Sequence, residues 1–103
     1  MRFEWTPQFD ADLSRLSDEE RTLFAQVAKE GFSPACDRHR ADKTLAWPRK
    51  LRVKHVAGTE GIYEMTWSFS GPDGRATFEW VMIGEDVGIR WRRIGGHAIF
   101  KRP

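Results

Sequence analysis

The sequence predicts an α+β domain: a short N-terminal strand, a two-helix hairpin, and then a twisted antiparallel sheet of about four strands. Apolar residues recur at helical spacing in the first third of the chain, and after Pro48 they alternate with polar residues as in half-buried strands. The length of 103 residues, with 40% apolar content, can close one modest core. We therefore expect a single domain over residues 1–103.

The N-terminal elements come first. Residues 3–5 alternate apolar and polar side chains as a short strand does, and Thr6-Pro7 ends the alternation. From about Gln8, apolar positions at helical spacing predict a first helix. Its apolar residues are Phe9, Leu13 and Leu16.

A second helix is predicted by its N-terminal cap. Ser17 precedes Glu20 by three residues, which is the spacing of a capping box. The apolar stripe that follows ends before Gly31, so we expect the helix to end there and residues 31–48 to be irregular.

Four strands are predicted after Pro48, at residues 50–56, 62–69, 76–83 and 87–94. The links between them are short and rich in turn residues, including residues 70–74 (Ser-Gly-Pro-Asp-Gly), which favours an antiparallel meander. In residues 62–69 a mostly polar set of side chains opposes an apolar set. We expect the helices to cover the apolar face and to leave the polar face open as a platform.

Positive charge is concentrated near the C-terminus. Up to Pro48 the chain has seven basic and nine acidic residues, and after it ten basic and six acidic, so the two parts carry about −2 and +4. Residues 88–103 (GIRWRRIGGHAIFKRP) contain five cationic side chains, a histidine and no acidic residue. Such a segment is suited to meet a polyanion.

The single cysteine, Cys36, excludes an intramolecular disulfide and fits a reducing compartment. The N-terminal residues contain no long apolar stretch, so neither a signal peptide nor a membrane span is expected. We expect a cytoplasmic protein.

Three stretches, KLRVKHV (residues 50–56), GIYEMTW (61–67) and RRIGGHAIF (92–100), resemble motifs of the RelE/ParE toxin superfamily of bacterial toxin-antitoxin modules. The resembling family motifs are K-L-x-G, G-x-Y/W-E-x-R and R-I-G-H-R-x-x-Y. The resemblance covers nearly the whole chain and implies a RelE-like fold.

The resemblance also implies activities and a partner. RelE and HigB toxins are ribosome-dependent endoribonucleases that cleave mRNA, whereas ParE toxins inhibit DNA gyrase. A neighbouring gene is expected to encode an antitoxin, of helix-turn-helix type, that covers the basic face. Its candidate anchors here are Phe3, Trp5, Trp47 and Trp80, whereas Trp67 and Trp91 are expected in the core.

RNA cleavage of this kind needs a base for the ribose 2′-hydroxyl, cations for the phosphorane and an acid for the leaving oxygen, and no metal or cofactor. His97 is the candidate acid or base, because histidine is the residue type suited to acid–base chemistry near neutral pH and His97 is the one histidine in residues 88–103. Arg90, Arg92 and Arg93 are candidates to hold the phosphate, and Glu64 is a second candidate base.

RNA-binding roles are predicted for six further residues. Phe100 stands where the family often has a tyrosine, so it can stack on a base but cannot exchange a proton. Arg75 lies near the position of a strand arginine in the family. The complete set is Lys50, Arg52, Lys54, Arg75, Phe100 and Lys101.

Structural interpretations compete with each of these roles. His97 can be a turn histidine after two glycines, and Glu64 can be a cross-strand partner of a base such as Arg52. Lys50, Arg52 and Lys54 can protect an edge strand from aggregation. The arginines of residues 90–93 can form an ordinary solvated strand face. Cys36 and His39 have a chelating spacing, but two ligands do not make a zinc site. Glu64 and Phe100 also fit a superfamily member that has lost its toxicity and acts as a binding or regulatory module.

Overall fold

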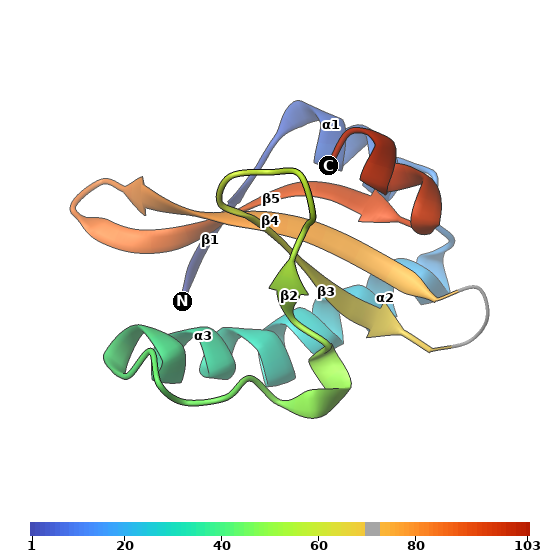
Figure 1. Ribbon diagram of the computed structural model, residues 1–103. Coiled ribbons are helices and arrows are strands. Elements are labelled where there is room, and N and C mark those ends of the chain that lie inside the picture. Colours follow the sequence, from blue (N-terminus) through green and yellow to red (C-terminus); the bar gives the residue numbers. More distant parts are fainter. Residues whose placement is uncertain (70–72) are drawn as a thin grey trace.

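The computed structural model describes residues 1–69 and 73–103 and has the predicted α+β class (Figure 1). Strand β1 (Arg2–Trp5) leads into helices α1 (Pro7–Ser14) and α2 (Asp18–Val27), a π-helical turn (Ala28–Phe32) and helix α3 (Ser33–Ala41). A 3-10 turn (Arg49–Leu51) precedes strands β2 (Lys54–His55), β3 (Ile62–Ser68), β4 (Gly74–Ile83) and β5 (Asp86–Gly95). A C-terminal 3-10 helix (His97–Lys101) follows.

The strands form one mixed sheet in the order β1-β5-β4-β3-β2. Strands β2 to β5 pair antiparallel, as the short links predict, but β1 pairs parallel with β5. Parallel pairing needs a long connection, and these two strands lie at opposite ends of the chain. Of the predicted turn at residues 70–74, residues 70–72 lie outside the described part of the chain.

The two predicted helix starts are correct. Thr6 caps α1 by accepting a hydrogen bond from the Phe9 amide at 3.1 Å. At α2 the Ser17 hydroxyl accepts from the Glu20 amide at 3.1 Å, and the Glu20 carboxylate accepts from the Ser17 amide at 2.9 Å. The capping box therefore forms as its spacing predicts.

The predicted end of the second helix before Gly31 is wrong. The chain continues through the π-helical turn into α3, so a large part of the stretch predicted as irregular is helical. Phe32 and Cys36 are fully buried, and their burial favours continuation. The wider π turn also places Pro34 at the start of α3, where a missing amide hydrogen is tolerated.

The predicted strand at residues 50–56 is also largely wrong. Leu51 is buried and holds residues 49–51 in a 3-10 turn against the core. Arg52 then adopts a left-handed conformation with φ of 45°. Only Lys54 and His55 pair with β3, so Lys50, Arg52 and Lys54 do not share one strand face.

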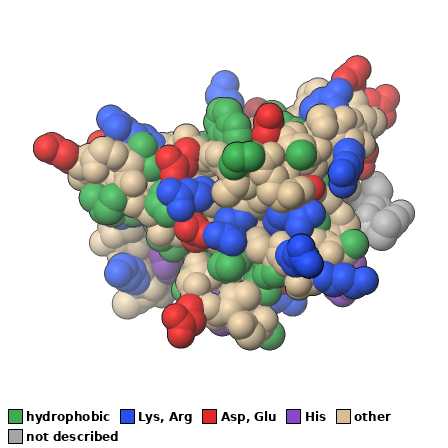
Figure 2. All heavy atoms as spheres, turned by 90° about the horizontal axis from the view of Figure 1, so that it is seen from above, with side chains coloured by type: hydrophobic (Ala, Val, Ile, Leu, Met, Phe, Trp, Pro, Cys, Tyr) green, Lys and Arg blue, Asp and Glu red, His purple; other side chains and the backbone are tan. Residues whose placement is uncertain are grey.

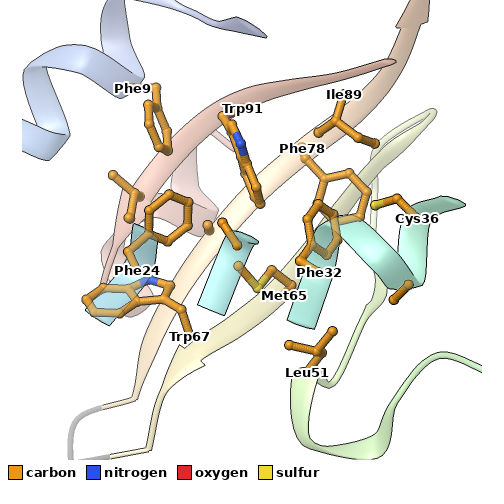
Figure 3. Packing of buried hydrophobic residues seen from close by; sticks show 14 residues of the cluster. Phe9, Phe24, Phe32, Cys36, Leu51, Met65, Trp67, Phe78, Ile89 and Trp91 are labelled. Carbon is orange, nitrogen blue, oxygen red and sulfur yellow. The ribbon is translucent and has the colours of Figure 1, made fainter. Parts of the chain in front are cut away.

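The core lies between the sheet and the helices α2 and α3, which run below the sheet in Figure 1. Aromatic rings from both layers meet there (Figure 3): Phe32 packs at 4.9 Å from both Phe78 and Trp91, and Phe24 at 5.1 Å from Trp91. Trp67 and Trp91 are core residues, as predicted, each only 3% exposed.

A β-bulge changes which way the end of β5 faces. Thr77 pairs with Arg93 whereas Phe78 pairs with Trp91, so Arg92 is an extra residue in β5. Simple alternation would place Arg93 on the core side with Trp91. The bulge instead pairs Arg93 with Thr77 and Ile94 with the buried Ala76.

The polar side of the sheet is not an open platform, contrary to expectation. Thr66 is 1% and Thr77 is 0% exposed, and Glu64 is also buried. The C-terminal residues fold back over part of this side, where the Thr77 hydroxyl donates a hydrogen bond to the Pro103 carbonyl oxygen at 3.0 Å.

Candidate functional site

The β5 arginines Arg90, Arg92 and Arg93 all have carboxylate partners from other segments. Arg90 donates through Nε to Glu4 at 2.7 Å and through Nη1 to Glu79 at 3.1 Å. Arg92 pairs with the other oxygen of Glu79 and donates to the Pro103 carbonyl at 3.2 Å. The segment lacks acids in sequence, but the fold supplies them.

Arg93 is tied most firmly. Its Nε and Nη2 donate to the two oxygens of Asp12 on α1 at 2.6 and 3.2 Å, and its Nη1 donates to the Arg102 carbonyl at 3.0 Å. Asp12 is 4% exposed and also accepts from the Ile94 amide at 3.1 Å. Burial by itself raises the pKa of Asp12, but the hydrogen bonds from Arg93, Ile94 and Gln8 outweigh it and lower the pKa. This pair joins α1 to the sheet.

A second charged group lies on β2, β3 and β4, and we call Lys54, Glu64 and Arg75 the Glu64 cluster. Glu64 is the register partner of Lys54, and its Oε1 lies 3.7 Å from Lys54 Nζ and 3.6 Å from Arg75 Nε. The fold thus brings the candidate base Glu64 together with Lys54 and Arg75, which were both predicted to bind RNA. Glu64 is a cross-strand partner of a base, as one interpretation predicted, but the bases are Lys54 and Arg75 rather than Arg52.

The Glu64 cluster is poorly hydrogen-bonded for its burial. The Glu64 side chain is 9% exposed and makes no hydrogen bond within the described residues. Arg75 Nε and Nη1 and the Thr66 hydroxyl are buried there without a hydrogen-bond partner among residues 1–69 and 73–103. Buried polar groups normally are hydrogen-bonded, so these atoms have unused capacity for a ligand's oxygen atoms.

Two further residues extend this cluster. Asp73 lies 3.2 Å from Arg75 Nη1 and 3.5 Å from Arg52 Nη1. The Arg52 guanidinium lies 5.2 Å from the centre of the exposed Phe69 ring. Three cations and two carboxylates therefore gather at this end of the sheet, beside an aromatic surface suited to base stacking.

The remaining predicted site residues lie apart from these pairs. His97 is exposed and packs edge-to-face on Phe100 with ring centres 5.2 Å apart. It follows Gly95, the register partner of Arg75, so it starts from the same end of the sheet. Lys101 is exposed in the C-terminal 3-10 helix, and Lys50 lines a separate groove beside α2.

The face seen from above shows how these charges are distributed (Figure 2). Lys and Arg side chains lie over the middle and right of the face, with some carboxylates between them and others at its left and upper right edges. The β5 arginines are part of a neutralised network, whereas the Glu64 cluster retains unsatisfied polar atoms.

Metal-binding groups are absent from residues 1–69 and 73–103: no three or more His, Cys, Asp or Glu side chains converge there. Cys36 is fully buried, and this burial raises the pKa of its thiol far above the usual range. His39 instead stacks on Trp47 with ring centres 4.6 Å apart.

The sequence did not indicate the partners of the β5 arginines or the role of Thr66 beside the Glu64 cluster. Asp12, Glu4 and Glu79 neutralise the β5 arginines from more than ten residues away along the chain, and no spacing signals such contacts. Thr66 could have been noticed as a polar residue between Met65 and Trp67, but its buried, unpaired hydroxyl depends on tertiary packing.

Comparison with protein families, with curated proteins and with solved structures gives no significant match. Within the described parts of the chain, no helix has the length and apolar character needed to cross a membrane.

Proposed function

We propose that this protein is a RelE-like toxin that cleaves RNA, on the ribosome, with the Glu64 cluster at its centre. The observation that carries the proposal is the Glu64 carboxylate, which lies between Lys54 and Arg75 and makes no hydrogen bond to any residue that the structure describes. A carboxylate beside two cations provides a proton acceptor and phosphate ligands in one place.

The proposed reaction uses the Glu64 cluster and one further side chain that serves as the acid. Glu64 removes the proton of a ribose 2′-hydroxyl, whose oxygen attacks the adjacent phosphorus. Lys54 and Arg75 stabilise the charge that builds on the phosphorane, and the 5′-oxygen leaves with a proton from an acid. His97 is the candidate acid. The products are a 2′,3′-cyclic phosphate and a free 5′-hydroxyl.

Access to Glu64 sets a condition on this mechanism. The carboxylate is largely buried, whereas the Lys54 side chain is 67% exposed. RNA must therefore draw Lys54 onto a phosphate before the ribose reaches Glu64. Such a rearrangement costs little because Lys54 makes a single, long ion pair.

A catalytically degenerate RNA-binding module is the second candidate. The burial of Glu64 favours it, and so does Phe100, which cannot transfer a proton. Such a module binds RNA through the same cations without cleaving it. A ParE-like gyrase inhibitor has no comparable support in these contacts.

The expected antitoxin also belongs to this proposal. Of the candidate anchors, Trp5 is 60% exposed on the edge strand β1, whereas Phe3 packs against Phe32 and Trp91. Trp5 is therefore the best-placed anchor for a partner. Cytoplasmic localisation follows from the same proposed role.

Induced expression in bacteria tests the proposal. The wild type is expected to halt translation and to produce mRNA fragments, and Glu64→Gln is expected to lower cleavage at least about 100-fold. Glu60→Gln makes the same chemical change at an exposed turn and is expected to leave cleavage unchanged. Equal cleavage by Glu64→Gln and wild type would refute the role of Glu64.

RNA binding separates the two candidates. Lys54→Ala is expected to weaken binding of single-stranded RNA and to reduce the dependence of log K on log salt by about 0.7, the value for one phosphate contact. Binding with this salt response but without cleavage indicates the degenerate module. Intact mRNA together with inhibited supercoiling in a purified assay indicates a gyrase inhibitor.

A further inference from the structure

A second groove lies on the core-facing side of the sheet, away from the Glu64 cluster. It has a volume of about 430 Å3, within the range of roughly 300–1,000 Å3 common for small-ligand sites. We call it the Trp80 groove. The residues that line it are His39, Arg40, Lys43, Tyr63, Trp80 and Val87.

Aromatic rings form the walls of the Trp80 groove. The His39 ring stacks on Trp47 at 4.6 Å and on Trp80 at 6.1 Å, with interplanar angles of 24° and 26°, and the two tryptophan rings lie 6.4 Å apart. Tyr63 stacks on the buried Phe78 at 5.8 Å. Both Trp80 and Tyr63 remain partly exposed, so the groove offers ring surface that is held in place from behind.

The groove also has positive charge that no carboxylate neutralises. Arg40 and Lys43 are exposed and make no ion pair or side-chain hydrogen bond within the described residues. Asp42 lies between them in sequence, but its carboxylate accepts hydrogen bonds from the Thr44 amide at 3.0 Å and hydroxyl at 2.6 Å. Asp86, next to Val87, pairs with Arg2 at 3.3 Å.

One buried atom in the groove lacks a partner. The Nδ1 atom of His39 is shielded from solvent and makes no hydrogen bond to the residues that the structure describes. The Trp80 groove thus combines ring faces, two free cations and an unused polar atom in a concave site, which is how small-ligand sites are composed.

We propose that the Trp80 groove binds a nucleotide, with its base against Trp80 and Tyr63 and its phosphate on Arg40 and Lys43. Base stacking suits partly exposed rings of this kind, and a phosphate takes hydrogen bonds from both cations. A mononucleotide and an unpaired nucleotide within a single strand share this chemistry. An acidic peptide would pair with the cations but leave the ring faces unoccupied.

This inference is independent of the proposed RNA cleavage, because no residue of the Trp80 groove belongs to the Glu64 cluster. Its failure and that of the cleavage proposal are therefore distinguishable.

Calorimetric titration of the whole chain with AMP tests the site. Arg40→Ala/Lys43→Ala is expected to weaken AMP binding at least about tenfold, because both phosphate contacts are lost. Arg15→Ala/Lys29→Ala removes the same charge from exposed positions outside the groove and is expected to keep wild-type affinity. Trp80→Leu retains an apolar side chain but removes the stacking ring, and it is expected to weaken AMP binding at least about fivefold.

A second arm identifies the source of the nucleotide. A 2′-O-methylated octanucleotide, which lacks the attacking hydroxyl, is titrated into the same variants. If the octanucleotide binds the wild type more tightly than AMP does, and Arg40→Ala/Lys43→Ala weakens its binding, the ligand is a nucleotide within a strand. If AMP binds the wild type as tightly as the octanucleotide does, the ligand is the free nucleotide. The proposal is wrong if the groove and control variants bind both probes equally, or if an oligo-aspartate peptide binds the groove and neither nucleotide probe does.

Discussion

Arg93 on β5 and Arg75 on β4 both lie on the polar side of the sheet, but their guanidinium groups have different partners. Arg93 donates two hydrogen bonds to Asp12 and one to the Arg102 carbonyl. Arg75 lies 3.6 Å from Glu64 and 3.2 Å from Asp73, and its Nε and Nη1 make no hydrogen bond within the described part of the chain. Arg93 donates three hydrogen bonds within the fold, whereas Nε and Nη1 of Arg75 donate none to the described residues.

The comparison separates structural from functional charge. A bidentate, buried pair such as Asp12–Arg93 joins two elements and leaves little for a substrate. A charged group with poor hydrogen bonds is costly to the fold, and such groups are common at binding and catalytic sites. The Glu64 cluster is therefore the better candidate site, although the β5 arginines dominate the sequence.

Removal of Asp12 is expected to have the largest effect. Asp12→Ala leaves the guanidinium of Arg93 without its carboxylate and is expected to cost about 3 kcal/mol of unfolding free energy. Urea denaturation measures this loss. Asp10→Ala, on the exposed side of the same helix, is expected to cost less than about 1 kcal/mol. Equal losses in the two variants would show that the pair does not hold α1 to the sheet.

Acid should weaken the same pair. The pKa of Asp12 is lower in the folded chain than its ordinary value, so its contribution is present above about pH 4, the unfolded pKa of an aspartate, and is lost as the pH falls through the folded pKa. Thermal unfolding between pH 6 and pH 2 measures this loss. A smaller decline is expected for Asp12→Ala, and parallel declines would contradict the assignment.

Two buried threonines, one beside the β5 arginines and one beside the Glu64 cluster, allow the two charged groups to be compared directly. Thr77 donates to the Pro103 carbonyl, so Thr77→Val is expected to destabilise the fold by about 1 kcal/mol. The Thr66 hydroxyl has no hydrogen-bond partner among the described residues, so Thr66→Val is expected to be neutral or to stabilise the fold by up to about 1 kcal/mol. Chemical denaturation of both variants checks the sign. A loss at Thr66 as large as at Thr77 would show that its hydroxyl is satisfied in solution.

Removal of the Glu79 carboxylate, which frees Arg90 and Arg92 of a shared partner, is expected to have the smallest effect of these changes. Glu79→Gln removes the carboxylate that Arg90 and Arg92 share and is expected to raise affinity for single-stranded RNA by roughly twofold to fivefold. Filter binding at low salt measures the change. Glu85→Gln alters net charge equally at an exposed turn, and an identical gain there would indicate a general charge effect.

Local signals in the sequence predicted much of the fold. The capping box at Ser17 and Glu20 and the alternation in residues 62–69 depend on neighbours within a few residues, and both predictions are correct. The break at Gly31 and the strand at residues 50–56 were wrong because burial of Phe32 and Leu51 overrode the local pattern. The candidate site was predicted as separate residues, since no local rule brings Lys54, Glu64 and Arg75 together.

The sequence by itself determined the α+β class, the starts of α1 and α2, the strands β3, β4 and β5, and the excess of positive charge after Pro48. Only the tertiary structure decided which of those charges are free. Glu4 and Asp12 lie more than 80 residues from the arginines that they neutralise, and a bulge turns Arg93 toward Asp12. An ion pair depends on distance in space and on burial, and both are set by packing of the whole chain.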